Sequence, residues 1–409
     1  MIKRRRLHSS VPTRFKSLTR CACLLTLWPL IDAAVGSPPA MAEETTQANA
    51  AVSHSDLSVF RAANGAIRPI RTAADWAARR TQIIAGAELA MGPMPSFENL
   101  PALDPKPSED VRRGDVRRIT FTIAVDGVDR LPLDLYLPPP IAAEFDASQP
   151  TRSLGASSLP AVIALHPTGA AGKRIVAGEG GRPGRQYAIE LAQRGYVVVA
   201  PDYPSFGEYK DYDFSSDAYV SGTMKGIFNH RRCIDFVTSL PFVDAERIGA
   251  IGHSLGGHNA IFLGVFDERV KAIVSSCGWC PFHDYYGGDI KGWTSDRYMP
   301  RLRDVYGLDP DKVPFDFYEL VAALAPRTFV SVSPIDDSNF DVNGVRKAIP
   351  VAGRIYSLLN ARDELMLWTP DCEHDFPTEM RHQAYRVIDR VFQHEANQGA
   401  KPAQSKETN

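Results

Sequence analysis

The chain of 409 residues has no excess of charge of either sign. It carries 46 Lys and Arg against 48 Asp and Glu, a formal net charge of −2. Such a chain has no global basic field of the kind that holds nucleic acid. Its 30 Gly and 31 Pro follow no period, which excludes a collagen-like or low-complexity protein. A hydrophobic fraction of 44% is too high for a disordered chain, so a well-cored globular protein remains.

Long apolar runs are also lacking. The one run near the N-terminus, residues 21–35, contains Asp32 and falls short of the roughly 18 residues that a membrane span needs. It follows a basic stretch that begins at Lys3 and precedes a small-x-small cleavage site, Ala40-Met41-Ala42. This order is typical of a secretory signal peptide. We therefore predict a leader over residues 1–42 and an exported protein, periplasmic or extracellular, with an uncleaved anchor as the alternative.

Cleavage after Ala42 changes the composition of the remaining chain. It leaves 39 basic and 47 acidic residues, a net charge of −8, and no membrane span. Only four cysteines remain, too few for a disulfide framework in a domain of this size. Cys277-Gly278-Trp279-Cys280 matches a redox C-x-x-C motif, but it follows a predicted strand instead of opening a helix. We expect these cysteines to be structural or disulfide-bonded.

Local patterns divide the chain into an N-terminal extension and one large domain. Residues 43–70 are polar and without periodicity, which predicts a linker, whereas apolar residues recur at helical spacing over residues 72–91. A proline-rich connector follows at residues 101–107, so we assign 43–114 to a linker and a helical extension. Residues 115–395 form the predicted main domain, and residues 396–409 are predicted to be a disordered tail.

Strand and helix patterns alternate within the main domain. A hairpin is predicted over residues 118–125 and 131–137, with Asp126-Gly127 in its turn. Unbroken apolar runs then suit strands buried on both faces of a parallel sheet. Helix-length segments between them predict an α/β fold with helices on both faces of the sheet. An aromatic-rich interruption at 281–325 predicts a small cap. The apolar runs cover residues 161–165, 197–200, 247–251, 270–275, 328–332 and 365–368.

The segment Gly252-His253-Ser254-Leu255-Gly256 is a G-x-S-x-G motif between a predicted strand and a predicted helix. Glycines are needed there because side chains flanking so tight a turn would collide with its neighbours. The turn exposes the Ser254 hydroxyl as a candidate nucleophile. It also places the backbone N–H of Leu255 where a developing oxyanion would bind.

A serine nucleophile needs a base and an orienting carboxylate, in the chain order Ser, acid, His. His374 lies in a loop after the last predicted strand, and Asp336 and Asp337 follow the strand before it. Counting from the strand end favours Asp336, but the pattern leaves both open. A second oxyanion N–H is expected from Thr168, in the loop after the first buried strand. A metal site at Glu373-His374-Asp375 is not indicated, because these adjacent residues lack ligand partners at helical spacing. The triad chemistry needs no metal or organic cofactor, so none is expected.

Aromatic residues in and before the predicted cap could wall a pocket for an acyl group or a sugar. The alternative is that they pack the cap against the sheet. Arg297 could bind an acidic substrate group or remain a solvated surface charge. The aromatic residues are Trp279, Tyr285, Tyr286, Trp293 and Tyr298.

Several segments resemble the α/β-hydrolase superfamily, in its dienelactone hydrolase and acetyl xylan esterase-like branch. They are residues 243–249, the G-x-S-x-G turn, residues 266–271 and 275–278, and the Asn339-Phe340 pair after Asp337. The resemblance implies an eight-stranded, mostly parallel sheet and hydrolysis of a carboxylic ester, with Ser254, Asp337 and His374 as the triad. Dienelactone hydrolases proper carry cysteine at the nucleophile position, where this chain has Ser254.

Together these features predict a secreted serine esterase that forms an acyl-enzyme intermediate. Its substrate would be a small-molecule or carbohydrate ester, for example an acetylated or uronate sugar ester. A serine peptidase of the prolyl-oligopeptidase type is one alternative, although residues 43–114 are few for the gating domain it usually carries. A non-catalytic binding module on a hydrolase scaffold is another, although such modules typically lose a triad residue and this chain fills all three positions.

Overall fold

The computed structural model describes residues 52–154, 158–215 and 219–394, which belong to one compact unit, Ala51–Asn409. The predicted leader at 1–42 and the predicted tail at 396–409 lie outside these described residues. Within the described ranges, no helix combines the length and the apolar character needed to cross a bilayer.

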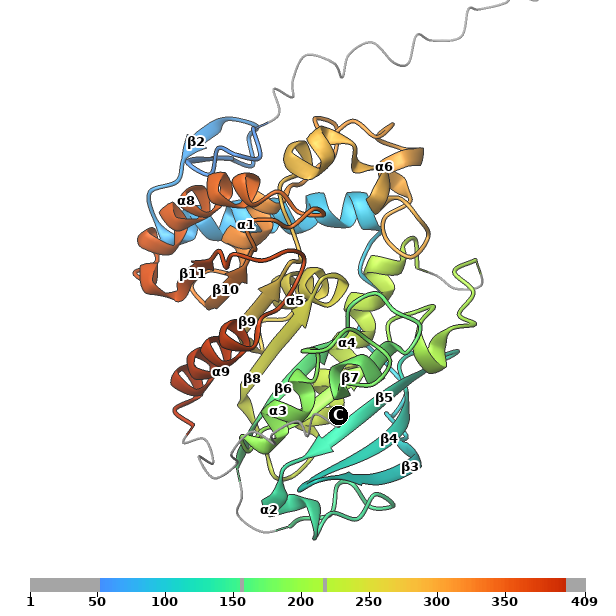
Figure 1. The fold of residues 1–409 in the computed structure, drawn as a ribbon. Helices are drawn as coiled ribbons and strands as arrows, with labels where there is room; N and C mark the ends of the chain where they lie inside the picture. Colours follow the sequence, from blue (N-terminus) through green and yellow to red (C-terminus); the bar gives the residue numbers. More distant parts are fainter. Residues whose placement is uncertain (1–51, 155–157, 216–218, 395–409) are drawn as a thin grey trace, which may run out of the picture. The chain divides into compact units, whose positions relative to one another are not determined.

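A nine-stranded sheet organises the molecule (Figure 1), with the order β11-β10-β9-β8-β6-β7-β5-β4-β3. The pairings from β11 to β7 are parallel, and those from β7 to β3 are antiparallel. The prediction of a mostly parallel sheet is thus confirmed. The strands are β3 (Lys106–Arg113), β4 (Val116–Ala124), β5 (Arg130–Leu137), β6 (Leu159–Leu165), β7 (Val197–Pro201), β8 (Val243–His253), β9 (Val270–Ser276), β10 (Thr328–Val332) and β11 (Leu365–Trp368).

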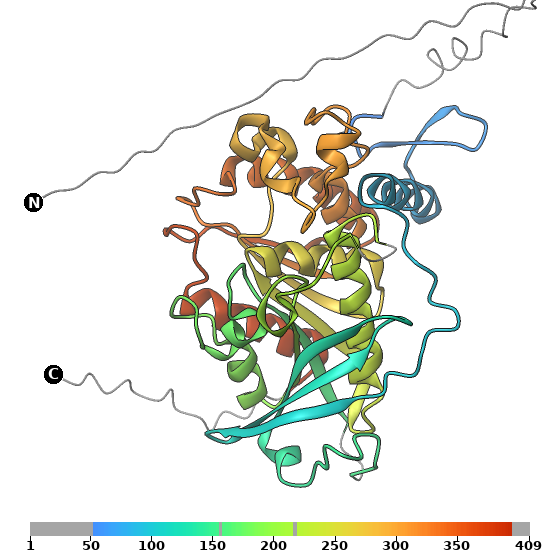
Figure 2. The same cartoon turned by 90° about the vertical axis from the view of Figure 1, so that its right-hand side faces the viewer.

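The ninth strand, β3, is the difference from the eight strands expected. Its side chains are nearly all exposed at the sheet edge, and it contains Pro107. Without a buried face, it has neither an apolar run nor alternation, and it was therefore predicted as part of a connector. Figure 2 shows β3, β4 and β5 side by side, with the segment after α1 running to β3.

Alternating side chains of the central strands build a core on each face of the sheet. In β6, Ala161 and Ile163 belong to one core and Val162 and Ala164 to the other. Helices α3 (Tyr187–Gln193) and α9 (Thr378–Phe392) cover the second face. The first face is covered by α1 (Ala73–Met91), α4 (Gly222–Thr238), α5 (Leu255–Phe266), α7 (Phe317–Ala323) and α8 (Val342–Leu358).

The N-terminal extension is more ordered than the predicted linker. Residues Val59–Arg61 (β1) and Ile67–Pro69 (β2) pair as a short antiparallel hairpin. Both strands have only three residues and no buried side chain, so they leave no sequence pattern. The predicted helix over residues 72–91 is confirmed as α1, which begins with a capping box between Thr72 and Asp75.

One buried carboxylate ties this extension to the cap. Glu319, in α7, accepts hydrogen bonds from His54 at 2.7 Å and from Arg79, in α1, at 2.5 Å. Its side chain is buried, so the Arg79 guanidinium and the hydrogen bond from His54 offset the cost of removing a charge from water. The remaining cap elements are the 3-10 helices η3 (Phe282–Gly288) and η4 (Ile290–Trp293) and the short helix α6 (Arg301–Asp304).

The structure contains a helix that the sequence did not predict, and it decides whether Cys277 and Cys280 form a disulfide. Helix α8 was not predicted, and Pro350 interrupts its sequence pattern. The cysteines at 233, 277, 280 and 372 are all free, so the disulfide alternative for Cys277 and Cys280 is wrong. Both of these side chains are buried in the core, which agrees with a structural role.

Parallel pairing brings the predicted functional loops to one edge of the sheet. Thr168 follows β6, Ser254 follows β8, Asp337 follows β10 and His374 follows β11. These strands run in the same direction, so their carboxyl ends lie at the same edge. Small 3-10 turns complete the connections: η1 (Gly172–Ala177), η2 (Gly207–Tyr209) and η5 (Arg362–Glu364), with the short helix α2 (Pro139–Ala142) after β5.

Candidate active site

The turn between β8 and α5 holds Ser254 in a strained backbone conformation. Its φ is 56° and its ψ is −120°, a region that residues with a side chain rarely occupy. The N–H of Ser254 donates to the Ser276 carbonyl at 2.8 Å, which helps to hold the strain. A Cβ on Gly252 would lie 2.2 Å from the Gly256 carbonyl carbon, and one on Gly256 would lie 2.0 Å from the Leu165 oxygen. Only glycine therefore fits on either side of Ser254.

His374 connects Ser254 to Asp337. Its Nε2 lies 2.9 Å from the Ser254 Oγ, and its Nδ1 lies 2.9 and 3.0 Å from the two Asp337 carboxylate oxygens. The side chain of the neighbouring Asp336 is exposed, and its backbone N–H donates to the Cys372 carbonyl oxygen. Of the two candidate acids, the structure therefore places Asp337 against His374.

The Asp337 carboxylate is held in its charged form. Burial alone would raise its pKa, but the hydrogen bond from His374 opposes this effect. The backbone N–H groups of Asn339 and Phe340 also donate to Asp337, at 2.8 and 3.2 Å. Together these groups keep the pKa of Asp337 below its usual value. A charged carboxylate accepts a hydrogen bond from the Nδ1–H of His374, which leaves Nε2 as the acceptor for the Ser254 hydroxyl.

Leu255 and Thr168 line cavities that reach Ser254, and their backbone N–H groups have no acceptor among the described residues. Leu255 is the first residue of α5, so its N–H has no partner within the helix. Thr168 lines both cavities that reach Ser254, and its N–H makes no hydrogen bond to any described residue. An oxyanion formed next to Ser254 could accept from both groups.

The larger of these two cavities, about 260 Å³, contains His374 and two arginines. Arg185 is almost fully buried and donates to Asp375, while Arg182 is exposed. Burial lowers the pKa of His253, which also lines this cavity, and the positive charges of Arg185 and Arg182 lower it further. His253 is therefore a neutral residue of the cavity wall. The other lining residues are Pro167, Thr168, Gly169, Ile175, Gly180, Gly181 and Ser254.

The smaller cavity, about 80 Å³, is mostly aromatic and does not contain His374. Trp293 and Tyr298 line it, as the sequence predicts, and so does Tyr285. His258 also lines it and was not predicted, although it lies one helical turn after Ser254 on the same helix face. The other lining residues are Thr168, Ser254, Leu255, Gly292, Asn339 and Phe340.

Three predicted residues lie outside both cavities. Trp279 is 1% exposed, and its indole N–H donates to the Ser331 hydroxyl at 2.9 Å, so it packs the core instead of lining a pocket. Tyr286 points outward with 62% of its surface exposed. Arg297 lies over the Phe206 ring at 4.3 Å and donates to Ser205 at 2.7 Å, which gives it a structural partner instead of a pocket position.

One three-residue group in the described chain has the spacing of metal ligands. The ligand atoms of Cys277, Asp337 and His374 lie within 4.8 Å of one another. Asp337 and His374 are hydrogen-bonded to each other, and burial raises the pKa of the Cys277 thiol well above its usual value. The Cys277 thiol also donates to the Asp375 carbonyl oxygen at 3.2 Å, so all three side chains already have protein partners.

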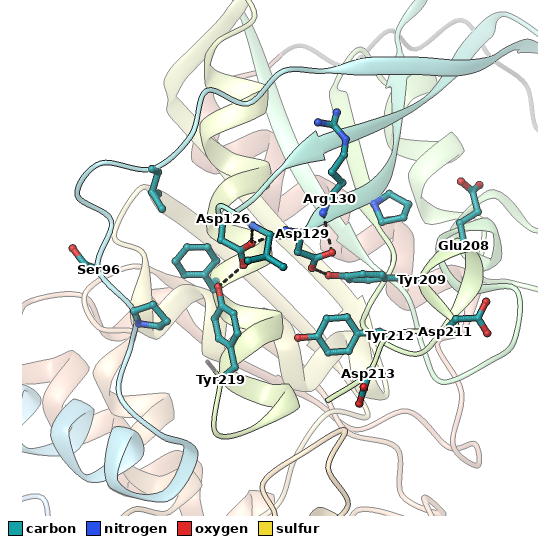
Figure 3. A pocket seen from close by; sticks show the side chains of 15 residues that line it. Ser96, Asp126, Asp129, Arg130, Glu208, Tyr209, Asp211, Tyr212, Asp213 and Tyr219 are labelled. Atoms are coloured by element: carbon teal, nitrogen blue, oxygen red, sulfur yellow. Dashed lines mark hydrogen bonds between the residues drawn. The ribbon is translucent and has the colours of Figure 1, made fainter. Parts of the chain in front are cut away.

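A further cavity, about 830 Å³, shares no lining residue with the two at Ser254. Figure 3 shows Tyr209, Tyr212 and Tyr219 near the carboxylates of Asp126 and Asp129. The buried ammonium group of Lys225 forms ion pairs with both carboxylates, at 2.9 and 3.0 Å. This tyrosine cavity is thus a separate feature at the β4–β5 turn.

The strained turn allows a direct test of its glycine requirement. Gly256→Ala should lower the free energy of unfolding by about 1–3 kcal/mol, because its Cβ would overlap the Leu165 carbonyl oxygen. The measurement is urea denaturation followed by circular dichroism. Gly127→Ala is the matched control, since a Cβ there meets no atom within 4 Å. Equal stability of the two variants would contradict the steric argument.

Comparisons with known proteins agree with the α/β fold described above. A family model described as the alpha/beta hydrolase family matches residues 162–400. YtaP of Bacillus subtilis (strain 168) is 26% identical over 215 residues, covering 50% of this chain and 68% of YtaP. Carbohydrate esterase MZ0003, from an unknown prokaryotic organism, is 24% identical over 202 residues, which cover 43% of this chain and only 45% of that protein.

A solved structure extends the likeness to most of the fold. A glucuronoyl esterase from Solibacter usitatus superposes with a TM-score of 0.63 at 18% sequence identity, covering 84% of this chain and 98% of that one. At this identity the superposition shows the fold. The family model covers more than half of the chain, including the strand–turn–helix around Ser254. The chain therefore belongs to the alpha/beta hydrolase family.

Proposed function

We propose that this chain is an exported serine esterase that hydrolyses carboxylic esters of carbohydrates. The observation that carries the proposal is the continuous hydrogen-bonded series from Ser254 through His374 to Asp337, beside two N–H groups that lack acceptors. This combination of nucleophile, base, orienting acid and oxyanion donors is what acyl transfer requires.

In the first half of the proposed reaction, the Ser254 Oγ attacks the ester carbonyl carbon while His374 Nε2 takes the hydroxyl proton. Asp337 stabilises the imidazolium that results, and the N–H groups of Thr168 and Leu255 bind the tetrahedral oxyanion. When the oxyanion collapses, the bond from the carbonyl carbon to the alcohol oxygen breaks. His374 gives its proton to that oxygen, which leaves an acyl ester on Ser254.

In the second half, His374 removes a proton from water, and the resulting hydroxide oxygen attacks the acyl carbonyl. The same two N–H groups bind the second oxyanion. Its collapse breaks the bond to the Ser254 Oγ, which regains a proton from His374, and the carboxylic acid leaves. Neither half requires a group beyond the residues named and water.

A carbohydrate ester is supported by the similar proteins and by the cavities. One relative is named a carbohydrate esterase and one structural neighbour a glucuronoyl esterase. The larger cavity presents glycines and two arginines, which suit a polar leaving alcohol better than an aliphatic one. His374 lines this cavity, so the alcohol that it must protonate belongs there.

Replacing the nucleophile tests the reaction. Ser254→Ala should lower kcat for short aryl esters by at least about 10⁴-fold, because the covalent step is lost. Initial rates on ester and peptide substrates, with circular dichroism to verify folding, provide the measurement. Turnover by the wild type that does not exceed that of Ser254→Ala on either substrate would end the proposal, and cleavage of peptides alone would favour a peptidase.

The neighbouring aspartates provide an internally matched pair. Asp337→Asn should lower kcat by about 10⁴-fold, because an amide favours the wrong His374 tautomer. Asp336→Asn should leave kcat within a factor of two, since its side chain is exposed and has no contact with His374. Steady-state kinetics of both variants tests the assignment. A larger loss in Asp336→Asn would reverse it.

Export rests on the N-terminal sequence alone. We propose that residues 1–42 direct export and are removed, so that the processed protein begins at Glu43. Expression of the full chain in a bacterial host, followed by fractionation and N-terminal sequencing, checks this expectation. Recovery of the uncleaved chain in the membrane fraction would instead support an anchor.

A further inference from the structure

Two buried polar side chains in the smaller cavity have no hydrogen-bond partner. His258 is 1% exposed, and neither of its ring nitrogens contacts a donor or acceptor among the described residues. The indole N–H of Trp293, which is 4% exposed, is likewise unpaired within the described chain. Both residues line the cavity that reaches Ser254. Buried polar groups without partners are rare, because each loses its hydrogen bonds to water on folding.

The surroundings of His258 do not explain why an imidazole is present. Its ring centroid lies 4.6 Å from that of Phe262 and 4.7 Å from that of Trp293. An apolar ring would pack there equally well and would avoid the unpaired nitrogens. Burial lowers the pKa of His258 to about 3, so the ring is neutral, with one N–H donor and one acceptor nitrogen. His258 and Trp293 thus offer two donors and one acceptor to whatever enters the cavity.

The reaction geometry assigns this cavity to the acyl side of the ester. The leaving alcohol must reach His374 to receive a proton, and His374 lines only the larger cavity. The smaller cavity contains Ser254 and the oxyanion donor Leu255 but not the base. The acyl group, which stays bound to Ser254 after the alcohol leaves, therefore occupies the smaller cavity.

We propose that the smaller cavity binds an acyl group bearing a hydroxyl close to the ester carbonyl, with His258 and Trp293 as its hydrogen-bonding partners. This inference rests on the proposed esterase function and narrows its substrate class to esters of hydroxy acids, sugar acids included. An acetyl group in this cavity would leave the ring nitrogens of His258 and the indole N–H of Trp293 without hydrogen-bond partners. A cavity of about 80 Å³ suits a short hydroxyacyl chain or the hydroxylated edge of a sugar ring.

Two ethyl esters with the same alcohol and nearly the same acyl shape test this preference. Ethyl lactate carries a hydroxyl where ethyl isobutyrate carries a methyl group. The wild type should favour lactate in kcat/KM by about 100-fold, since sites built around a substrate hydroxyl reject analogues that lack it. His258→Phe should reduce this preference by about 10- to 100-fold, and Trp293→Phe should also reduce it.

Thermal stability separates recognition from a structural role. His258→Phe should unfold at the same temperature as the wild type or higher, because it removes unpaired buried nitrogens. Phe262→Leu is the matched control, since it disturbs the same packing but removes no polar atom. This control should change kcat/KM for the two esters by the same factor.

Three outcomes would overturn the inference: no preference for lactate by the wild type, equal losses on both esters in His258→Phe, or a lower melting temperature of that variant. If the wild type hydrolyses neither these esters nor short aryl esters faster than Ser254→Ala does, the esterase function itself is at fault. In that case, NMR titration of Ser254→Ala with lactate and isobutyrate still tests the cavity. Tighter binding of lactate, weakened by His258→Phe, would support hydroxyl recognition, and equal binding would refute it.

Discussion

The contact between the first turn of α5 and the end of β6 is the constraint on which the site depends. Gly256 lies against the Leu165 carbonyl so closely that no side chain fits between them. This approach forces the chain to leave β8 through the strained conformation of Ser254. The serine hydroxyl, the Leu255 N–H and the His258 ring all take their positions from the same helix start. A shift of that helix would therefore move the proposed nucleophile, an oxyanion donor and a wall of the smaller cavity together.

Parallel pairing supplies the other half of the site. Val332, at the end of β10, is in register with Trp368, at the end of β11. The two loops that follow therefore start side by side, although Asp337 and His374 are 37 residues apart. The Asp337 carboxylate is then held by backbone N–H groups of its own loop. The proposed acid and base are thus positioned by strand register first and by local hydrogen bonds second.

The features that sequence patterns predicted well are those with a strong local signal. Buried parallel strands require unbroken apolar runs, and a G-x-S-x-G turn requires its glycines, so the fold and Ser254 were both accessible. Asp336 and Asp337 could not be separated, because rotation of a loop by one residue has no signature in the sequence. Strands β1, β2 and β3 were missed because none of them has a buried side chain, so their sequences show no apolar alternation. Trp279 and Trp293 are chemically alike, and only tertiary packing decides which of them meets the cavity.

The exposed edge strand β3 affects how readily copies of this protein associate at high concentration. An edge strand exposes unpaired backbone groups that invite another chain to add to the sheet. In β3 these groups are accompanied by exposed charges, by Pro107 and by a bulge between Pro107 and Glu109. Each of these features hinders the flat, continuous pairing on which strand addition depends. The strand with the weakest sequence signal is therefore suited to guarding the enzyme against intermolecular β-aggregation.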